Sequence, residues 1–427
     1  MPTIDIAPAR GWPEGVTPTA APGLSVNAFA SDLDHPRWLY VLPNGDVLVA
    51  ETNAPEREDD GKGISGWVMD RVMKRAGAGV PSVNRITLLR DADGDGTAET
   101  SAIFLDGLNS PFGMTLVGTD LYVANTDALL RFDYEDGAAR ISSPGQKVVD
   151  LPAGAINHHW TKNVIASDNG ALLYVTVGSN SNIAENGIDN EENRAAILEV
   201  DPGTRQVRLF ALGLRNPNGL AWEPVTGELW TTVNERDMLG SDLVPDYLTN
   251  VPVGAQYGWP WVYWGDKIDE RVEAAMPNFL TEYTRRPEYA LGPHVAALGL
   301  AFTREGSTMG DAFGHGAFIA RHGSWNRKPP SGYDVVFIRF DDRGNPVGKP
   351  EQVLGSFLAG DGKTHGRPTW VAWDKTGALL VSDDTAGIIW RITAPGAAPA
   401  AAPARITGAR LPAQRNLNAD PSRPFGE

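Results

Sequence analysis

Histidine and arginine residues recur at one kind of position along this chain, immediately before short apolar segments. Of its seven histidines, the ones at such positions are His35, His158, His159, His294 and His365. Arginines join them at Arg37, Arg215 and Arg367. A histidine with a near-neutral pKa can accept a proton at physiological pH, and an arginine binds carboxylates through paired hydrogen bonds. Together these residue types predict a site that moves a proton and holds an anion.

The same stretches are rich in basic and aromatic side chains, although the whole chain carries a net charge of −16. The basic residues are Arg215, Arg321, Arg327, Lys328 and Arg367, and the tryptophans are Trp160, Trp259, Trp261 and Trp325. Local positive charge beside flat aromatic rings favours an anionic, planar ligand. The alternative is that some of these tryptophans belong to the hydrophobic core.

The elements that must position these residues are six similar segments, which begin at Pro36, Pro111, Lys162, Pro217, Leu298 and Pro368. Each has a short apolar strand, a turn and a second β-rich strand, as in PRWLYVLPNGDVLVAET. Turn pairs such as Asn44-Gly45 supply the positive φ angles of tight hairpins. Six β-units favour an all-β, six-bladed β-propeller, because radial closure leaves few open sheet edges. A β-sandwich with similar hairpins is the alternative.

A propeller would bring distant polar residues together. The connection into the innermost strand of each blade opens near the axis on one face, so equivalent positions in successive blades converge there. We therefore expect His158, Arg215 and Arg367 to lie around a common axis, on loops held by a rigid scaffold. For any single histidine, a hydrogen-bonding role at the surface is the alternative.

Composition limits the other classes of function. The chain has no cysteine, which excludes disulfides, iron–sulfur clusters and cysteine nucleophiles. Its acidic balance disfavours nucleic-acid and anionic membrane partners, and no apolar run is long enough for a membrane span. We predict an N-terminal extension at 1–23, the propeller at 24–393 and an Ala/Pro-rich tail at 394–427, either mobile or strap-like.

Several motifs of this sequence resemble those of one known family. They include INHHWTKNVIASDNGALLYVTVGSN, GLRNPNGLAW, AQYGWPW and HGRPTWVAW. Over roughly residues 24 to 393, the chain resembles the L-sorbosone dehydrogenase branch of the soluble quinoprotein glucose dehydrogenases. That resemblance implies a six-bladed propeller that oxidises a sugar or sugar-derived aldehyde with pyrroloquinoline quinone (PQQ) and calcium. It also implies a periplasmic location, and it leaves the electron acceptor unknown.

The resemblance implies roles for particular residues. In the family, the catalytic histidine lies four residues before a basic residue that opens a strand. Lys162 is that basic residue here, so His158 matches the catalytic base, and His159 is the alternative. Arg215 matches the arginine that contacts the quinone oxygens and stabilises charge there. The implied cofactor contacts are Asn157, Asn216, Arg327, Lys328, His365 and Arg367. His365 departs from the family, which has an arginine there, and Arg327 and Lys328 are candidates for a family lysine without a clear match.

The resemblance also implies a calcium ion beside the cofactor, held by the backbone carbonyls of Glu235 and Arg236, where it would act as a Lewis acid. A second calcium candidate comes from the residues themselves. Carboxylates alternate with glycines at Asp91, Asp93, Asp95 and Glu99, as in the first part of an EF-hand loop. Ala102 stands where that loop needs a glutamate, and an acidic hairpin tip without metal is the alternative.

Two other functions remain open. A metal-dependent sugar lactonase on the same fold needs a carboxylate and amide cluster on the axis, for which the candidates are Glu51, Asn125, Asn234 and Asp383. That function leaves Arg215 and Arg367 without a role. The other alternative is a non-catalytic propeller that uses its ring of polar residues as a binding surface.

Overall fold

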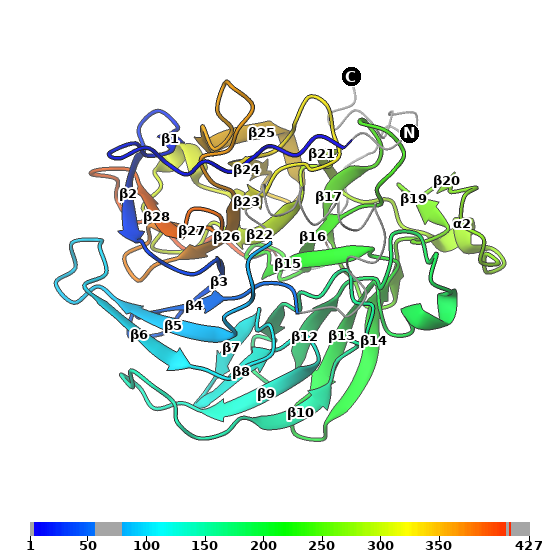
Figure 1. Ribbon diagram of the computed structural model, residues 1–427, viewed down its shortest axis with the longest axis horizontal. Helices are drawn as coiled ribbons and strands as arrows, with labels where there is room; N and C mark the ends of the chain where they lie inside the picture. Colours follow the sequence, from blue (N-terminus) through cyan, green and yellow to red (C-terminus); the bar gives the residue numbers. More distant parts are fainter. Residues whose placement is uncertain (1–3, 56–78, 407–409, 411–427) are drawn as a thin grey trace.

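The computed structural model describes residues 4–55, 79–406 and 410. Six sheets of four or five strands are arranged radially around a centre (Figure 1). The protein is therefore a six-bladed β-propeller, which confirms the fold that the repeats predict.

The first three blades follow one another along the chain. Blade 1 consists of β3 (Pro36–Val41), β4 (Val47–Glu51), β5 (Arg85–Arg90) and β6 (Thr100–Leu105). Blade 2 consists of β7 (Met114–Val117), β8 (Asp120–Ala124), β9 (Ala128–Asp133) and β10 (Gln146–Asp150). Blade 3 consists of β11 (Val164–Ala166), β12 (Leu173–Val177), β13 (Ala196–Asp201), β14 (Gln206–Leu212) and the short parallel strand β18 (Ala255–Gln256).

The other three blades complete the ring. Blade 4 consists of β15 (Asn216–Trp222), β16 (Leu229–Asn234), β17 (Pro245–Asn250) and β21 (Tyr289–Pro293). Blade 5 consists of β22 (Ala297–Phe302), β23 (Gly316–Arg321), β24 (Asp334–Phe340), β25 (Pro346–Gly355) and β1 (Thr19–Ala20). Blade 6 consists of β26 (Pro368–Trp373), β27 (Leu379–Asp383), β28 (Ile388–Thr393) and β2 (Ser25–Ala30).

The repeats of the sequence correspond to the inner hairpins of the blades. Each innermost strand contacts the next, in the order β3, β7, β11, β15, β22, β26 and back to β3. Glycines allow this close approach: a Cβ at Gly113 would lie 2.4 Å from the backbone nitrogen of Val164, in the next blade. The second strands are buried on both faces, which is why they read as continuous apolar runs such as LYVTV in β12.

Two chain ends close the ring. β2 pairs with β28 in antiparallel register, with Ser25 opposite Thr393, so blade 6 combines strands from both ends of the chain. This pairing covers the open edge of β28 and ties the two ends of the chain together. Ahead of β2, residues 4–16 run along the ends of blades 5 and 6, as the dark-blue chain at the top of Figure 1.

The segments outside the blades are short. An excursion beside blade 4 carries β19 (Val262–Tyr263), β20 (Lys267–Ile268) and the helix α2 (Leu280–Tyr283), and two 3-10 turns lie at Ile188–Glu191 and Asp311–Phe313. The tail after β28 runs along the blades, where Ile406 N donates to the Val225 carbonyl. Arg410 is buried against Glu228 and Asn345. In the described ranges, no helix is long and apolar enough to cross a bilayer.

Candidate active site

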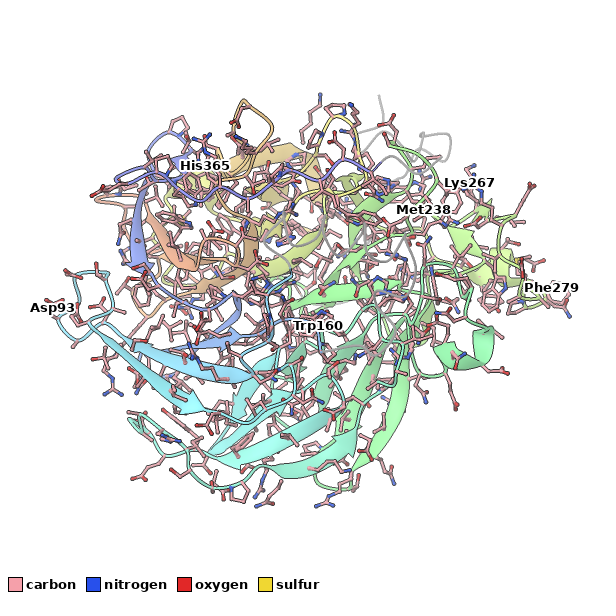
Figure 2. All side chains as sticks on the ribbon, in the orientation of Figure 1. Asp93, Trp160, Met238, Lys267, Phe279 and His365 are labelled. Carbon is pink, nitrogen blue, oxygen red and sulfur yellow. The ribbon has the colours of Figure 1, made fainter. Side chains whose placement is uncertain are left out.

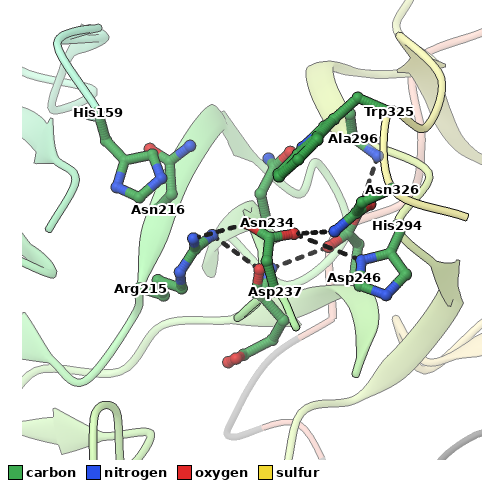
Figure 3. A pocket seen from close by; sticks show the side chains of 11 residues that line it. His159, Arg215, Asn216, Asn234, Asp237, Asp246, His294, Ala296, Trp325 and Asn326 are labelled. Atoms are coloured by element: carbon green, nitrogen blue, oxygen red, sulfur yellow. Dashed lines mark hydrogen bonds and ion pairs between the residues drawn. The ribbon is translucent and has the colours of Figure 1, made fainter. Parts of the chain in front are cut away.

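Loops and strand ends of blades 3, 4 and 5 enclose a polar cavity of about 170 Å³. Its lining residues are His159, Arg215, Asn216, Asn234, Glu235, Asp237, Asp246, His294, Ala296, Trp325 and Asn326 (Figure 3). They come from the connection into β11, the start of β15, the end of β16, strand β17, the connection into β22 and the loop after β23. Residues more than 150 positions apart in the chain thus meet at one place, as a propeller requires.

Arg215 is held on several sides inside this cavity. Its Nη1 donates to the Glu235 carbonyl at 2.7 Å, and its Nη2 donates to Asn182 Oδ1 and Asp237 Oδ2, each at 2.9 Å. The arginine is only 4% exposed. A buried cation is therefore paired with a carboxylate and fixed in one orientation.

Asp237 connects Arg215 to the opposite wall of the cavity. Its Oδ1 accepts a hydrogen bond from Asn326 Nδ2 at 2.7 Å and lies 3.5 Å from His294 Nδ1. Burial disfavours the charged carboxylate, but Arg215 and His294 outweigh it and lower the pKa of Asp237 to about 2. Burial alone would lower the pKa of His294, and its hydrogen bond with Asp237 raises it above 6.5. The contact between Asp237 and His294 therefore favours a charged carboxylate and a protonated imidazole.

His159 faces Arg215 across the cavity. Its Nδ1 lies 3.0 Å from the Ser179 carbonyl and 2.9 Å from Ser179 Oγ, whose own proton goes to the Ser181 carbonyl. Both neighbours of Nδ1 are therefore acceptors, which places the ring proton on Nδ1 and the lone pair on Nε2. Burial, and next the Arg215 charge, lower the pKa of His159 well below 6.5. The imidazole is neutral and can accept a proton.

The close approach of His159 and Asn216 depends on a glycine. A Cβ at Gly178 would lie 2.3 Å from His159 Cβ and 2.5 Å from Asn216 Oδ1. Within the described part of the chain, that Asn216 oxygen is buried without a hydrogen-bond partner. His158, in contrast, is exposed and does not line the cavity.

Two further carboxyl groups lie in the wall, and the sequence motifs did not single out either side chain for a role. Asp246 accepts hydrogen bonds from the backbone nitrogens of Glu235 and Ala296 at 2.8 and 2.7 Å. Burial raises the pKa of Asp246 to about 6 and that of Glu235 to about 7. The wall therefore carries less negative charge near neutral pH than its composition suggests.

A second cluster of buried charges lies at the junction of blades 5, 6 and 1. We call it the Asp384 cluster, and it consists of His35, Arg37, His322, Arg367 and Asp384. Asp384 accepts hydrogen bonds from Arg37 Nη1 and His322 Nε2, each at 2.9 Å, and lies 3.6 Å from His35 Nε2. Burial opposes its ionisation, but the surrounding histidines and Arg37 hold the pKa of Asp384 far below its usual range.

This cluster has more positive charge than its carboxylate can neutralise. Burial lowers the pKa of His35 to about 4. Arg37 is paired with Asp384, whereas the Arg367 guanidinium contacts only the Gly323 carbonyl and Tyr333 among the described residues. Among the described side chains, buried nitrogens without a hydrogen-bond partner include Arg37 Nε and Arg367 Nε. Arg37 also lies over the ring of Trp160, at 5.9 Å, next to His159 in the chain. Surplus cationic donors beside the cavity suit an anionic ligand.

The remaining sequence-predicted cofactor residues lie elsewhere. Asn157 is buried, and its amide donates to Thr126 Oγ1 and accepts from Arg194. Arg327 pairs with Asp242 at 3.0 Å, whereas Lys328 is exposed. His365 stacks on Trp12, with ring centroids 4.8 Å apart.

Most of the predicted tryptophans belong to the interior rather than the cavity. Trp160 is part of the core cluster that includes Phe112, and Trp259 is also buried. The indole nitrogen of Trp261 donates to the Ala274 carbonyl. Trp325 is the one that lines the cavity. Asp237 and Asp384 are among the residues that sequence reasoning missed, and each follows a repeat and carries no signal beyond that position.

The two calcium candidates differ in their ligands. In the described ranges, the one group of three or more acidic or histidine side chains with ligand atoms within 4.8 Å of one another is Asp91, Asp93, Asp95 and Glu99. This loop lies at the rim of the propeller, far from Trp160 near its centre (Figure 2). At the cavity, the Glu235 carbonyl already accepts a hydrogen bond from Arg215, so an ion there would compete with a guanidinium. The described side chains do not supply a converging calcium site at the cavity.

Known proteins support an assignment to a family. A family model described as TrAA12-like matches residues 18–252 and 270–395. The chain is 24% identical, over 88% of its length, to a pyrroloquinoline quinone-dependent pyranose dehydrogenase of Coprinopsis cinerea. It is 22% identical, over 39% of its length, to an aldose sugar dehydrogenase of Escherichia coli. The chain spans 55% and 48% of the length of these two relatives.

Solved structures agree on the fold. The carbohydrate-active enzyme of family AA12 from Trichoderma reesei has a TM-score of 0.70 at 19% identity, covering 91% of this chain and 98% of that one. The PQQ domain of the Coprinopsis cinerea pyranose dehydrogenase has a TM-score of 0.68 at 20% identity, covering 91% and 100%. The family match covers well over half of the residues, and this chain belongs to the TrAA12-like family.

Proposed function

We propose that this protein is a PQQ-dependent dehydrogenase that oxidises a sugar or a sugar-derived aldehyde, with His159 as the general base. The observation that carries the proposal is the half-buried imidazole of His159, held through Nδ1 by Ser179 so that Nε2 can accept a proton, in the same polar cavity as the fixed Arg215 cation. The PQQ dependence named for one relative and the sugar substrates named for both relatives support the same reaction class. Sorbosone is one candidate substrate within that class.

The cofactor would lie across the propeller mouth, between the cavity and the Asp384 cluster. Arg37 and Arg367, whose Nε atoms have no hydrogen-bond partner among the described residues, are suited to cofactor carboxylates, and Arg215 and Asn216 to the quinone end. When bound, PQQ would supply a hydride acceptor. The fit rests on these buried donors, because a buried donor that has no partner within the described chain carries a free-energy cost.

The chain's own contribution to the reaction is a proton acceptor and a fixed charge. Oxidation removes a proton from the hydroxyl oxygen and a hydride from the carbon that bears it, and the C–O bond becomes a carbonyl. His159 Nε2 would take the proton, while Ser179 holds the ring through Nδ1. Arg215 would stabilise negative charge that develops on the oxygens near it, and Asp237 prevents it from turning away. We place His159 in this role, rather than His158, because His159 alone of the two lines the cavity.

The alternative functions find less support. For a lactonase, Glu51 and Asp383 would have to bind a metal, but both are used internally: Glu51 accepts from Arg85 and Thr87, and Asp383 accepts from Trp12 and Trp390. Asn234 likewise donates to the Ala297 carbonyl at 2.7 Å. No particular contact favours a purely binding propeller.

Reconstitution tests the proposal. The purified protein is incubated with PQQ, with and without calcium, and reduction of an artificial electron acceptor is followed with aldoses and sorbosone. We expect sugar-dependent reduction only with PQQ. Metal-dependent hydrolysis of a sugar lactone without an effect of PQQ would support the lactonase instead. Inertness in both assays would favour a binding propeller. Fractionation of the native cells tests the periplasmic location that belongs to the same proposal.

A further inference from the structure

The N-terminal segment before the propeller is in contact with both halves of the candidate site. We call residues Asp5–Trp12 the N-terminal strap. It crosses the ends of blades 5 and 6 (Figure 1) and is bonded to two loops, at 325–326 and at 364–367. These loops carry a wall of the cavity and the backbone of Arg367, respectively.

The first contact fixes the cavity wall. Asp5 N donates to the Trp325 carbonyl at 3.0 Å, and Asp5 forms a parallel bridge with Asn326. Asn326 in turn donates to Asp237, the partner of Arg215. The strap thus supports the wall that orients the fixed cation of the cavity.

The second contact is more extensive and lies at the loop before β26. Two backbone hydrogen bonds of 2.8 Å join Thr364 to the strap, from Arg10 N and to the Pro8 carbonyl. His365 Nδ1 donates to the Gly11 carbonyl at 3.1 Å, and its ring stacks on Trp12 at an interplanar angle of 19°. The loop is therefore held through both its backbone and its side chain.

Trp12 also reaches Arg367 through a buried carboxylate. The Trp12 indole nitrogen donates to Asp383 Oδ2 at 2.8 Å, and Asp383 Oδ1 accepts from the Arg367 backbone nitrogen at 2.7 Å. A Cβ at Gly366 would lie 2.0 Å from Asp383, so the loop can approach this carboxylate only because glycine stands there. Asp383 is fully buried and thus transmits the position of Trp12 to the main chain of Arg367.

The Arg367 side chain itself is only weakly restrained. Its guanidinium has two hydrogen bonds of 3.4 Å, to the Gly323 carbonyl and Tyr333 Oη, and lies 5.0 Å from the Tyr333 ring centre. Its Nε has no partner among the described residues. A long side chain binds an anion more tightly when its backbone is already fixed, because less conformational entropy is lost on binding.

We propose that the N-terminal strap pre-organises the anion-binding half of the site, with Trp12 as the positioning residue for Arg367. This inference rests on the proposed function, since the anion in question is the cofactor's carboxylate. Trp12 touches neither the cavity nor the Arg367 guanidinium, and it acts through Asp383 and His365. An extension outside the propeller thereby supports the cofactor site without contacting the cofactor.

The test compares two tryptophan variants. Trp12→Phe keeps an aromatic ring against His365 but removes the hydrogen bond to Asp383. Trp373→Phe is the matched control, because Trp373 belongs to the hydrophobic cluster that Trp12 packs against, and its indole nitrogen donates to the Phe302 carbonyl instead. We measure the Kd for PQQ by quenching of protein fluorescence, the unfolding midpoint with and without PQQ, and kcat at saturating PQQ.

We expect Trp12→Phe to weaken PQQ binding by about three- to tenfold, the effect of losing one hydrogen bond in a positioning network. Its kcat at saturating PQQ stays within about twofold of the wild type, because His159 and Arg215 are untouched. Trp373→Phe lowers the unfolding midpoint without changing the Kd by more than about twofold.

Equal Kd values for Trp12→Phe and the wild type would overturn the inference, as would equal losses of affinity in Trp12→Phe and Trp373→Phe. A wild-type protein that binds no PQQ would instead refute the proposed function, and the strap inference with it. The two failures are distinguishable because the first requires wild-type binding and the second its absence.

Discussion

Arg215 and Arg367 stand at corresponding places, each at the start of an inner hairpin, yet their surroundings differ. Arg215 is bonded to a carboxylate, a carbonyl and an amide, with contacts of 2.7 to 2.9 Å. Arg367 has two contacts of 3.4 Å, and within the described chain its Nε has none. Under the proposed function, Arg215 therefore supplies a fixed charge for the reaction, whereas Arg367 remains available to bind a ligand.

The largest expected effect concerns the base beside the fixed arginine. His159→Gln should lower kcat by about 10²- to 10⁴-fold, the usual contribution of a general base. His158→Gln is the matched control and should change kcat by less than about threefold, because His158 does not line the cavity. Steady-state kinetics with PQQ and an aldose measure both. A larger loss in the His158 variant would return the role to the residue that the family spacing indicates.

The next effect tests the ligand-binding arginine. Arg367→Met should raise the Kd for PQQ by roughly 10- to 100-fold, because a hydrogen bond to a charged group is lost. At saturating PQQ, its kcat should remain near the wild-type value. Arg339→Met, at an exposed pair with Glu351 on blade 5, is the control. If Arg367→Met lowered kcat and left the Kd for PQQ unchanged, Arg367 would act in the reaction rather than in binding the cofactor.

The carboxylate that fixes Arg215 should also contribute to the stability of the fold. Asp237→Asn should lower the free energy of unfolding at pH 7 by about 2 kcal/mol, from the shift of its pKa to about 2. Because the folded pKa lies below the unfolded value, this contribution is present above pH 4 and is lost as the pH falls toward 2. Urea unfolding at pH 7 and pH 3 measures it. Asp242→Asn, at an exposed carboxylate, should change stability by less than about 0.5 kcal/mol.

The pH dependence of the rate gives a smaller signal. The pKa of His159 lies well below 6.5 because of burial and the Arg215 charge. A base that stays neutral in mild acid keeps kcat/KM nearly constant as the pH falls from 8 to 6. A base of ordinary pKa would lose most of its activity over that range. The kcat/KM profile with a non-ionising sugar distinguishes the two outcomes.

Local features of the fold could be predicted from the sequence, whereas features of irregular loops could not. The repeats predicted the blades because hairpins are local and their turns have recognisable residues such as Asn44-Gly45. Arg215 and Asn216 could be expected at the mouth because they lie at the start of a strand. His158 and His159 could not be separated, because an irregular loop has no period that assigns a side to each residue.

The hydrogen-bond and ion-pair partners of these residues could not be predicted from the sequence. Asp237 meets Arg215 and Asn326 through loops of two blades, and Asp384 meets His322 and Arg37 across three. Long-range pairs of this kind leave no local pattern. Asn157 adjoins the histidine pair in sequence, but its amide is bonded to Thr126 and to buried Arg194.

The smallest expected effect lies at the rim. Calcium bound by Asp91, Asp93, Asp95 and Glu99 should raise the unfolding midpoint by roughly 2 °C at saturating ion, as ligand linkage predicts for a weak site on a large domain. Asp93→Asn should abolish that rise and leave the Kd for PQQ unchanged. A calcium-dependent Kd for PQQ that persists in Asp93→Asn would instead locate an ion at Glu235 and Arg236, beside the fixed arginine.

Single-turnover reduction of bound PQQ tests the central claim most directly. The protein is loaded with PQQ, mixed with an aldose without an electron acceptor, and the absorbance of the oxidised cofactor is followed. The account predicts complete, sugar-dependent loss of that absorbance in the wild type, and in His159→Gln it predicts PQQ binding with reduction slowed by about 10²- to 10⁴-fold. Reduction at the wild-type rate in His159→Gln would contradict it.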